Sequence, residues 1–283
     1  MKKGIYIAAV IIIVFVFFML KFYLIKSYNH DMCPSISKGE YILVSRISPD
    51  KMSRLNIIAY HFPDIADKKI RKKPVHISRL MALPGDTIEI HNKKVYVNRD
   101  YIDNKLSLFY KYRISTDTSF NPNSFEKFNT LFENEIVPNK AWELFTSPEN
   151  TSMINELIGV SNVRFLPDLN RNKDYGVFPN SRFFNWNKDY FGPVIIPEAG
   201  KEIQINYMNI NLYKRIIDVY ENHNLIIKYR KIYIDGKEAT TYMPEQNYYF
   251  VMDDNRDHCN DSRHWGFLPA DHVAGIKTFQ RND

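Results

Sequence analysis

The most informative segment of this chain spans residues 254–269 and reads DNRDHCNDSRHWGFLP. Within it, two acidic and two basic residues lie close together: Asp254, Arg256, Asp261 and Arg263. Charge-assisted hydrogen bonds between such side chains hold a loop in one conformation. These four residues therefore predict support of the fold rather than a chemical role, and the apolar residues that follow indicate packing beneath the loop.

Two shorter segments lie nearer the N-terminus. Residues 31–36 read DMCPSI, and residues 78–86 read SRLMALPGD. The second contains Pro84, Gly85 and Asp86, which predict a turn because Gly85 adopts positive φ without a steric cost.

In this order, behind an apolar N-terminus, the three segments resemble the motifs of type I signal peptidase, the membrane-bound serine peptidase family that cuts signal peptides from exported preproteins. The resemblance covers the N-terminal segment and residues 27–103 and 230–283, and residues 185–197 also resemble an insertion of bacterial members. It implies a mainly β fold, with a signal-peptidase-like β core, an inserted α+β domain and one N-terminal transmembrane helix. Its structural motif residues here are Arg79, Asp86, Asp254, Arg256, Asp261 and Arg263.

The resemblance also implies a Ser–Lys dyad, with the serine directly before Met32 and the lysine directly before Arg79. This chain has Asp31 and Ser78 at those positions. A carboxylate is a poor nucleophile toward an amide and repels a developing oxyanion. A serine hydroxyl does not act as a general base near neutral pH. The substitutions predict a catalytically impaired protein that binds exported precursors or modulates an active paralogue.

The residues that support the dyad in the family also differ here. Asn29 occupies the place of an oxyanion-hole hydroxyl, and its amide can still donate a hydrogen bond. Cys259 stands where the family carries a serine that orients the lysine, and Asp253 stands where it carries glycine. The enzyme alternative is an active signal peptidase that uses unidentified residues, and a further alternative is a structural envelope subunit.

Other uses of the two cysteines and the acidic residues remain open. Cys33 and Cys259 either form a disulfide or stay free thiols, and His258 with one of these two cysteines is a candidate nucleophile pair if the motifs converge as the resemblance implies. An acid pair of Asp31 with Asp254 or Asp261 requires two carboxyls sharing one proton. The spacing of His, Cys and acidic residues indicates no metal site, and we expect no cofactor.

The N-terminus indicates a membrane anchor. Residues 4–20 carry no charge, and Phe22 to Ile25 extend the apolar run beyond Lys21. About 22 helical residues reach about 33 Å, which matches a bilayer core of about 30 Å. We expect residues 1–26 to be an uncleaved anchor in the bacterial cytoplasmic membrane, with the soluble domain on its outer side. A cleaved signal peptide is the alternative.

The rest of the chain divides into a β core at residues 27–103 and 230–283 and an inserted second domain at residues 104–229. Strands are expected at residues 40–47, 55–62, 75–83, 87–90, 94–98, 231–234, 248–252 and 273–279. Short helices are expected at residues 126–134 and 211–221. Asp235 and Gly236 predict a turn. The basic run at residues 68–73 predicts a solvated loop, with contact to lipid headgroups as the alternative.

Composition narrows the class of protein. The chain has 283 residues, of which 45% are hydrophobic and 25% charged, so most of it is expected to fold. The 38 basic and 32 acidic residues give a net charge of +6. Because the basic residues are scattered, nucleic acid is not an expected partner, whereas the lipid bilayer and exported preproteins are.

Overall fold

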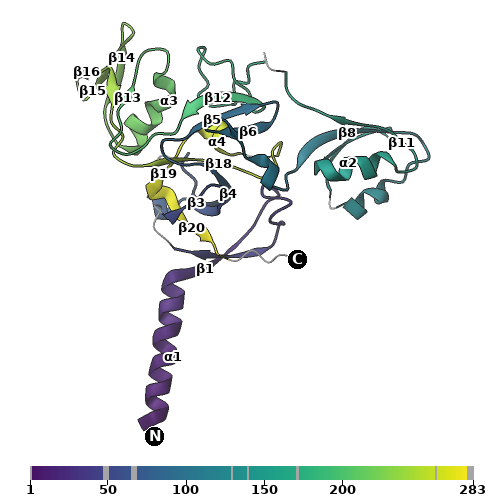
Figure 1. Ribbon diagram of the computed structural model, residues 1–283, viewed down its shortest axis with the longest axis horizontal. Helices are drawn as coiled ribbons and strands as arrows, with labels where there is room; N and C mark the ends of the chain where they lie inside the picture. The colour runs from purple at the N-terminus through teal and green to yellow at the C-terminus, as the bar shows by residue number, and fades with distance from the viewer. Residues whose placement is uncertain are drawn as a thin grey trace.

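The largest sheet brings both ends of the chain together (Figure 1). The computed structural model describes residues 2–46, 51–64, 69–128, 130–138, 140–169, 172–258 and 260–278. In spatial order the sheet contains β1 (Phe22–Lys26), β2 (Tyr41–Ser45), β20 (Val273–Lys277), β3 (Ile57–His61), β4 (Val75–Ala82), β18 (Tyr248–Met252) and β19 (Leu268–Pro269). The predicted β-rich character of the chain is confirmed.

Strand β18 is buried at every position because both of its faces are covered. Tyr248, Phe250 and Met252 face one hydrophobic core, and Tyr249 and Val251 face another. This alternation follows from the two-residue side-chain period of a strand. The segment that β18 leads into is therefore held between two packed layers.

A second sheet packs against the first core. Its strands are β12 (Tyr190–Ile195), β5 (Thr87–His91), β6 (Lys94–Val97) and β7 (Asp100–Tyr101). Strand β12 pairs antiparallel with β5, so residues from the middle of the chain join those near its start. The division into residues 1–26, 27–103 with 230–283, and 104–229 stays a prediction, because sheet membership alone does not draw domain boundaries.

A lobe beside the main body has its own sheet and core (Figure 1). It contains β11 (Val160–Phe165), β8 (Tyr110–Thr116), β10 (Ala141–Thr146) and β9 (Leu131–Val137), together with α2 (Pro148–Asn155). The helix predicted at residues 126–134 is wrong. A 3-10 helix at Pro122–Phe128 is followed by strand β9, because pairing with β10 overrides the weak local helix preference.

The other local predictions are largely confirmed. The expected helix at residues 211–221 is α3 (Ile210–Arg215) continued by a π-helix at Ile216–Tyr220. Asp235 and Gly236 have φ of 50° and 81° and connect β15 (Lys231–Ile234) to β16 (Lys237–Glu238). Both central residues of the turn thus have the positive φ that hairpin turns favour.

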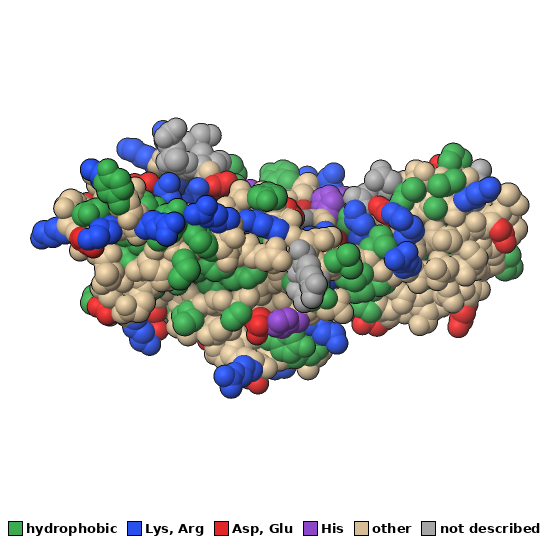
Figure 2. Space-filling view, turned by 90° about the horizontal axis from the view of Figure 1, so that it is seen from above, with side chains coloured by type: hydrophobic (Ala, Val, Ile, Leu, Met, Phe, Trp, Pro, Cys, Tyr) green, Lys and Arg blue, Asp and Glu red, His purple; other side chains and the backbone are tan. Residues whose placement is uncertain are grey.

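Helix α1 (Lys2–Lys21) projects away from the body (Figure 1). Its described large apolar side chains are 45% to 70% exposed, as at Phe18 and Tyr6. Within the part of the chain that the structure describes, no helix meets the length and apolarity required of a membrane span, so the predicted transmembrane helix is not confirmed. The face of the body turned away from α1 carries interspersed basic, acidic and apolar side chains (Figure 2).

The basic run is partly ordered into the body. A 3-10 helix forms at Ile70–Lys72, and Arg71 and Lys72 are exposed, as expected of a solvated loop. Lys73 departs from that expectation because it is buried, with its Nζ 2.9 Å from Nε2 of His272. The first residue of the run, at position 68, lies outside the described residues.

Candidate active site

A buried ion pair joins the three sequence segments. Arg79, in β4, donates from Nε to Oδ1 of Asp254 at 2.7 Å, and its Nη2 also bonds to that carboxylate. The same Nη2 donates to Oγ of Ser35 at 3.0 Å, and Nη1 donates to the carbonyl of Leu55 at 2.8 Å. One guanidinium therefore joins strand β4, which carries Ser78, to the loop that carries Asp31 and to the long C-terminal motif.

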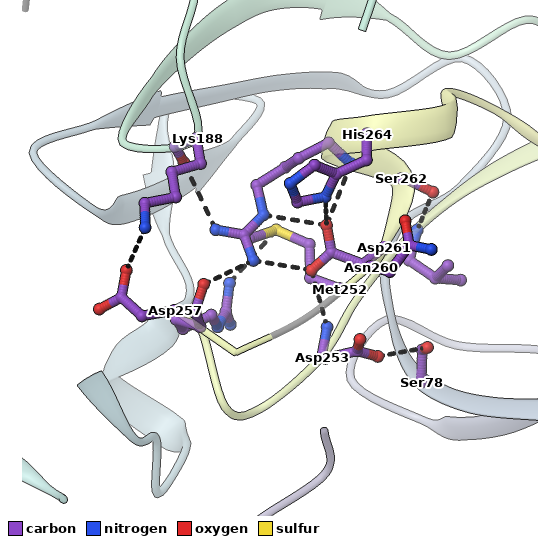
Figure 3. A network of polar contacts seen from close by, with 12 residues as sticks. Ser78, Lys188, Met252, Asp253, Asp257, Asn260, Asp261, Ser262 and His264 are labelled. Carbon is purple, nitrogen blue, oxygen red and sulfur yellow. Dashed lines mark hydrogen bonds and ion pairs between the residues drawn. The ribbon is translucent and has the colours of Figure 1, made fainter. Parts of the chain in front are cut away.

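A second buried network shapes the C-terminal motif (Figure 3). Arg263 donates from Nε and Nη2 to Asp261 at 2.9 and 2.8 Å, and from Nη2 to the carbonyl of Arg256 at 2.9 Å. Arg256 in turn donates to Asp103 at 2.8 Å. Although burial alone would raise it, the pKa of Asp261 lies well below its ordinary value because Arg263 stabilises the carboxylate.

The Pro-Gly-Asp turn is fixed in the same manner. Gly85 has φ of 83°, as expected of the turn. Asp86 accepts hydrogen bonds from Arg54, from the backbone N–H of Leu83 and from the side chain of Asn98. Burial alone would raise the pKa of Asp86, but these donors lower it below its ordinary value. These donors stabilise the carboxylate of Asp86 and fix the conformation of the turn.

A cleft of about 200 Å³ contains the nucleophile position of the family. It is lined by Lys26, Ser27, Tyr28, Asn29, Asp31, Met32, Pro74, Val75, His76, Ile77 and Asp253. Two carboxyl groups, Asp31 and Asp253, thus face one cleft.

The hydroxyl of Ser78 is committed to neighbouring polar groups. It donates to Oδ1 of Asp253 at 2.5 Å (Figure 3) and lies 3.0 Å from the hydroxyl of Tyr60. Ser78 is 1% exposed. Asp253 thus bonds to Ser78 and shares the cleft with Asp31, the two residues at which the resemblance implies a dyad.

The electrostatics of the cleft favour protonated carboxyl groups. Burial, reinforced by Asp261 and Asp31, raises the pKa of Asp253 well above its ordinary value, against the opposing effects of Ser78 and Arg263. Burial also raises the pKa of Asp31, although His258 opposes the rise. Two acids thus line the cleft, where the resemblance implies a hydroxyl and an amine.

Asp31 has partners of its own. Oδ1 lies 3.3 Å from Nδ1 of His258, and Oδ2 accepts a hydrogen bond from the side-chain amide of Asn29. The candidate oxyanion donor Asn29 is thus directed at Asp31. His258 contacts Asp31, whereas Cys259 lies outside the described residues, so the Cys–His pair stays a prediction.

The cysteines are only partly described. Cys33 is buried and forms no disulfide with any other described residue; its Sγ lies 3.8 Å from Nδ1 of His30 and 3.6 Å from the carbonyl oxygen of Ile36. Cys259 lies outside the described residues, so its supporting role and its disulfide to Cys33 stay predictions.

One wall of the cleft is an open strand edge. Phe62 N–H donates to the carbonyl of Pro74, so the next residue of β4, Val75, directs its own N–H and C=O away from β3. By the same alternation Ile77 does so as well. Strand β18 pairs only with the part of β4 from Arg79 to Ala82. Val75 and Ile77 therefore offer backbone donors and acceptors along the cleft.

The contacts that three residues make in or near the site could not be predicted from the sequence. Asp253 is visible as a departure from the family's glycine, but its bond to Ser78 is not. Tyr60 and Asp103 lie in ordinary strand and loop contexts, and nothing local marks them as partners of the motif. The sequence signal for this part of the site was the presence of Asp253 where the resemblance implies glycine, together with Ser78 where it implies lysine.

Asp253 and Asp261 have pKa shifts of opposite sign, so the pH dependence of protein stability tests both shifts. Asp253 favours its protonated form in the fold, so its contribution to stability falls as pH rises above the ordinary Asp pKa of about 3.9. We expect Asp253→Asn to raise the melting temperature at pH 7.5, with the gain disappearing near pH 4. Thermal unfolding of the unmodified chain and of Asp253→Asn across this pH range measures the difference in melting temperature.

Asp261→Asn serves as the matched control. Its carboxylate stabilises the fold above the ordinary Asp pKa, so this change is expected to cost about 3–5 kcal/mol at pH 7.5 by leaving Arg263 without its charged partner. Loss of stability in Asp253→Asn at pH 7.5, of a size similar to that control, contradicts a protonated Asp253.

Comparison with known proteins places these features in a family. The family model for "Signal peptidase, peptidase S26" matches residues 2–153 and 199–280. The chain is similar to signal peptidase I of Buchnera aphidicola subsp. Schizaphis graminum, with 23% identity over 93% of this chain and 70% of the relative. It is also similar to signal peptidase I of Aquifex aeolicus, with 24% identity over 93% and 78% of the two chains.

Among solved structures, a crystal structure of signal peptidase I from Enterococcus faecalis aligns with 81% of this chain and 97% of that one, at 16% identity and a TM-score of 0.28. That score is too low to support an argument about geometry. The family model, in contrast, matches well over half of the residues. The chain therefore belongs to the signal peptidase family, peptidase S26.

Proposed function

We propose that this chain binds the signal-peptide region of exported precursors without efficient cleavage, and that it retains them or modulates an active paralogue. One observation carries the proposal. The nucleophile and base positions hold Asp31 and Ser78, and the Ser78 hydroxyl donates to buried Asp253.

No activated serine replaces the missing dyad among the residues that line the cleft. Ser27 is the lining serine, and its hydroxyl is oriented toward the carbonyl of Asn29 at 3.4 Å. The lining lysine, Lys26, has its Nζ 5.7 Å from the ring centre of Tyr41. A serine nucleophile requires a base within hydrogen-bond reach, which this arrangement lacks.

Binding of a peptide does not require the catalytic residues that cleavage requires. An extended peptide adds to a strand edge through backbone hydrogen bonds, with side-chain pockets supplying specificity. The backbone groups of Val75 and Ile77 and the cleft beside them satisfy that requirement. Loss of the dyad therefore leaves the means of recognition in place.

The proposal includes attachment to the outer side of the bacterial cytoplasmic membrane through α1. Support comes from the sequence of residues 4–20, which carry no charge, and from the exposure of large apolar side chains such as Phe17 and Leu20. Exposed apolar surface of this extent calls for an apolar surrounding.

A second candidate function rests on the two acids of the cleft. Asp31 and Asp253 both have raised pKa values and both face it. An ionised carboxyl can accept a proton from water while a protonated one donates to the scissile carbonyl. This candidate is an acid-dependent peptidase. It predicts cleavage of a preprotein at acidic pH that Asp31→Asn abolishes, whereas the binding proposal predicts none.

Restoring the dyad tests the loss of activity. In the double variant Asp31→Ser and Ser78→Lys, the introduced lysine lies beside Asp253, and attraction between opposite charges favours an ionised Asp253 together with a protonated amine. We expect the double variant to remain nearly inactive. Addition of Asp253→Gly should raise preprotein cleavage at pH 8 by at least roughly 100-fold, followed by appearance of the mature product.

The triple variant with alanine in place of serine at position 31 is the matched control and should not cleave. Cleavage by the unmodified chain at pH 8 at the rate of the restored triple variant contradicts the proposed impairment.

Binding can be tested at the open strand edge. Val75→Pro removes an N–H that points into the cleft and leaves the ladder to β3 intact. We expect roughly fivefold weaker binding of a fluorescent peptide covering the C-terminal part of a bacterial signal peptide, measured by anisotropy. Val75→Ala keeps the N–H and should bind like the unmodified chain. Equal affinity in all three proteins rules out strand addition at this edge.

Attachment can be tested by truncation. Deletion of residues 2–21 removes α1 and should transfer the protein from the membrane pellet to the supernatant after alkaline carbonate extraction. Far-ultraviolet circular dichroism of the truncated protein checks that the β body is retained. Release of the full chain by the same extraction contradicts an inserted α1.

A further inference from the structure

A polar pocket of about 570 Å³ adjoins the peptide cleft and shares Val75 with it. It is lined by Tyr23, Arg46, His61, Ile70, Arg71, Val75, Asp271, Val273 and Ala274. Its volume falls within the range of about 300–1,000 Å³ that small-molecule sites occupy. Neither the lost dyad nor the peptide cleft accounts for it.

The pocket has a predominantly basic wall. Arg46 and Arg71 carry permanent positive charges, and His61 adds a ring whose Nδ1 lies 3.3 Å from the carbonyl oxygen of Lys73. The acidic group of the pocket, Asp271, has its Oδ1 2.7 Å from Nδ1 of His272. Two guanidinium groups around one cavity favour a phosphate, because their planar forks match its oxygen atoms.

The position of Arg46 ties the pocket to the end of α1. Its Nη1 donates to the carbonyls of Met19 and Leu20 at 3.2 and 2.8 Å. Its guanidinium lies 4.6 Å from the ring centre of Tyr23, in strand β1 directly after the helix. The arginine is thus held in place before any ligand arrives, at the level where the apolar helix ends.

Tyr23 adds an unsatisfied polar atom to the wall. Its hydroxyl is buried and has no hydrogen-bond partner among the described residues. A buried hydroxyl without a partner costs free energy, and a phosphate oxygen or a water held by it removes that cost.

We propose that this pocket binds the phosphate of an anionic phospholipid headgroup. The headgroup layer begins where an apolar helix leaves the hydrocarbon, and this is where α1 ends and Arg46 stands. The inference rests on the proposed membrane attachment. It also gives the basic run at residues 68–73 a role, since Arg71 belongs to that run and lines the pocket.

Binding is tested with the full chain in detergent. Dioctanoyl phosphatidylglycerol is titrated, and the shift of melting temperature is followed with dioctanoyl phosphatidylcholine as the uncharged reference. We expect saturable stabilisation by phosphatidylglycerol, and roughly tenfold weaker affinity in Arg71→Gln. Lys72→Gln is the matched control. It makes the same charge change one residue away, outside the pocket lining, and should alter affinity less than twofold.

The other outcomes overturn the proposal. Equal weakening by Arg71→Gln and Lys72→Gln means that only net charge attracts the lipid. Inorganic phosphate or glycerol phosphate that stabilises at the same concentration identifies a free phosphate rather than a lipid as the ligand. Because this assay involves neither peptide nor extraction, its failure is distinguishable from failure of peptide binding or of membrane attachment.

Discussion

The buried pair between Arg79 and Asp254 is the contact on which the arrangement of the site depends. It ties strand β4 to the C-terminal motif and, through Ser35, to the loop that carries Asp31. Removing one partner of a buried pair leaves an uncompensated charge and typically costs about 3–5 kcal/mol. The contact makes no use of the two missing catalytic side chains, so the scaffold can persist without them.

The side chains that line the cleft differ from those that the resemblance implies. The resemblance implies a hydroxyl and an amine there, whereas this chain has Asp31 and Asp253 in the cleft, and Ser78 donates a hydrogen bond to Asp253. Burial keeps protons on carboxyl groups that lack cationic partners. Neighbouring Asp261 stays ionised because Arg263 contacts it directly. Asp253 and Asp261 thus have pKa shifts of opposite sign, because only Asp261 has a guanidinium in direct contact.

Local chemistry predicted much of the fold. The strands around Phe250 and Ile77 follow from their apolar composition, and the Asp235-Gly236 turn follows from its need for positive φ. The predicted helix at residues 126–134 failed, because β9 forms there by pairing with β10. The partnership of Arg256 with Asp103 could not be predicted, since nothing in either segment identifies the other.

The sequence by itself determined that Asp31 and Ser78 precede Met32 and Arg79, where the resemblance implies a serine and a lysine, and where the long apolar run lies. Tertiary structure alone decided that Ser78 bonds to an acid 175 positions away, that the edge of β4 stays open, and that Arg46 and Arg71 line one pocket. The physical reason is that residue type is a local property. Burial, pKa and strand pairing, in contrast, are set by distant segments brought into contact only when the sheet closes.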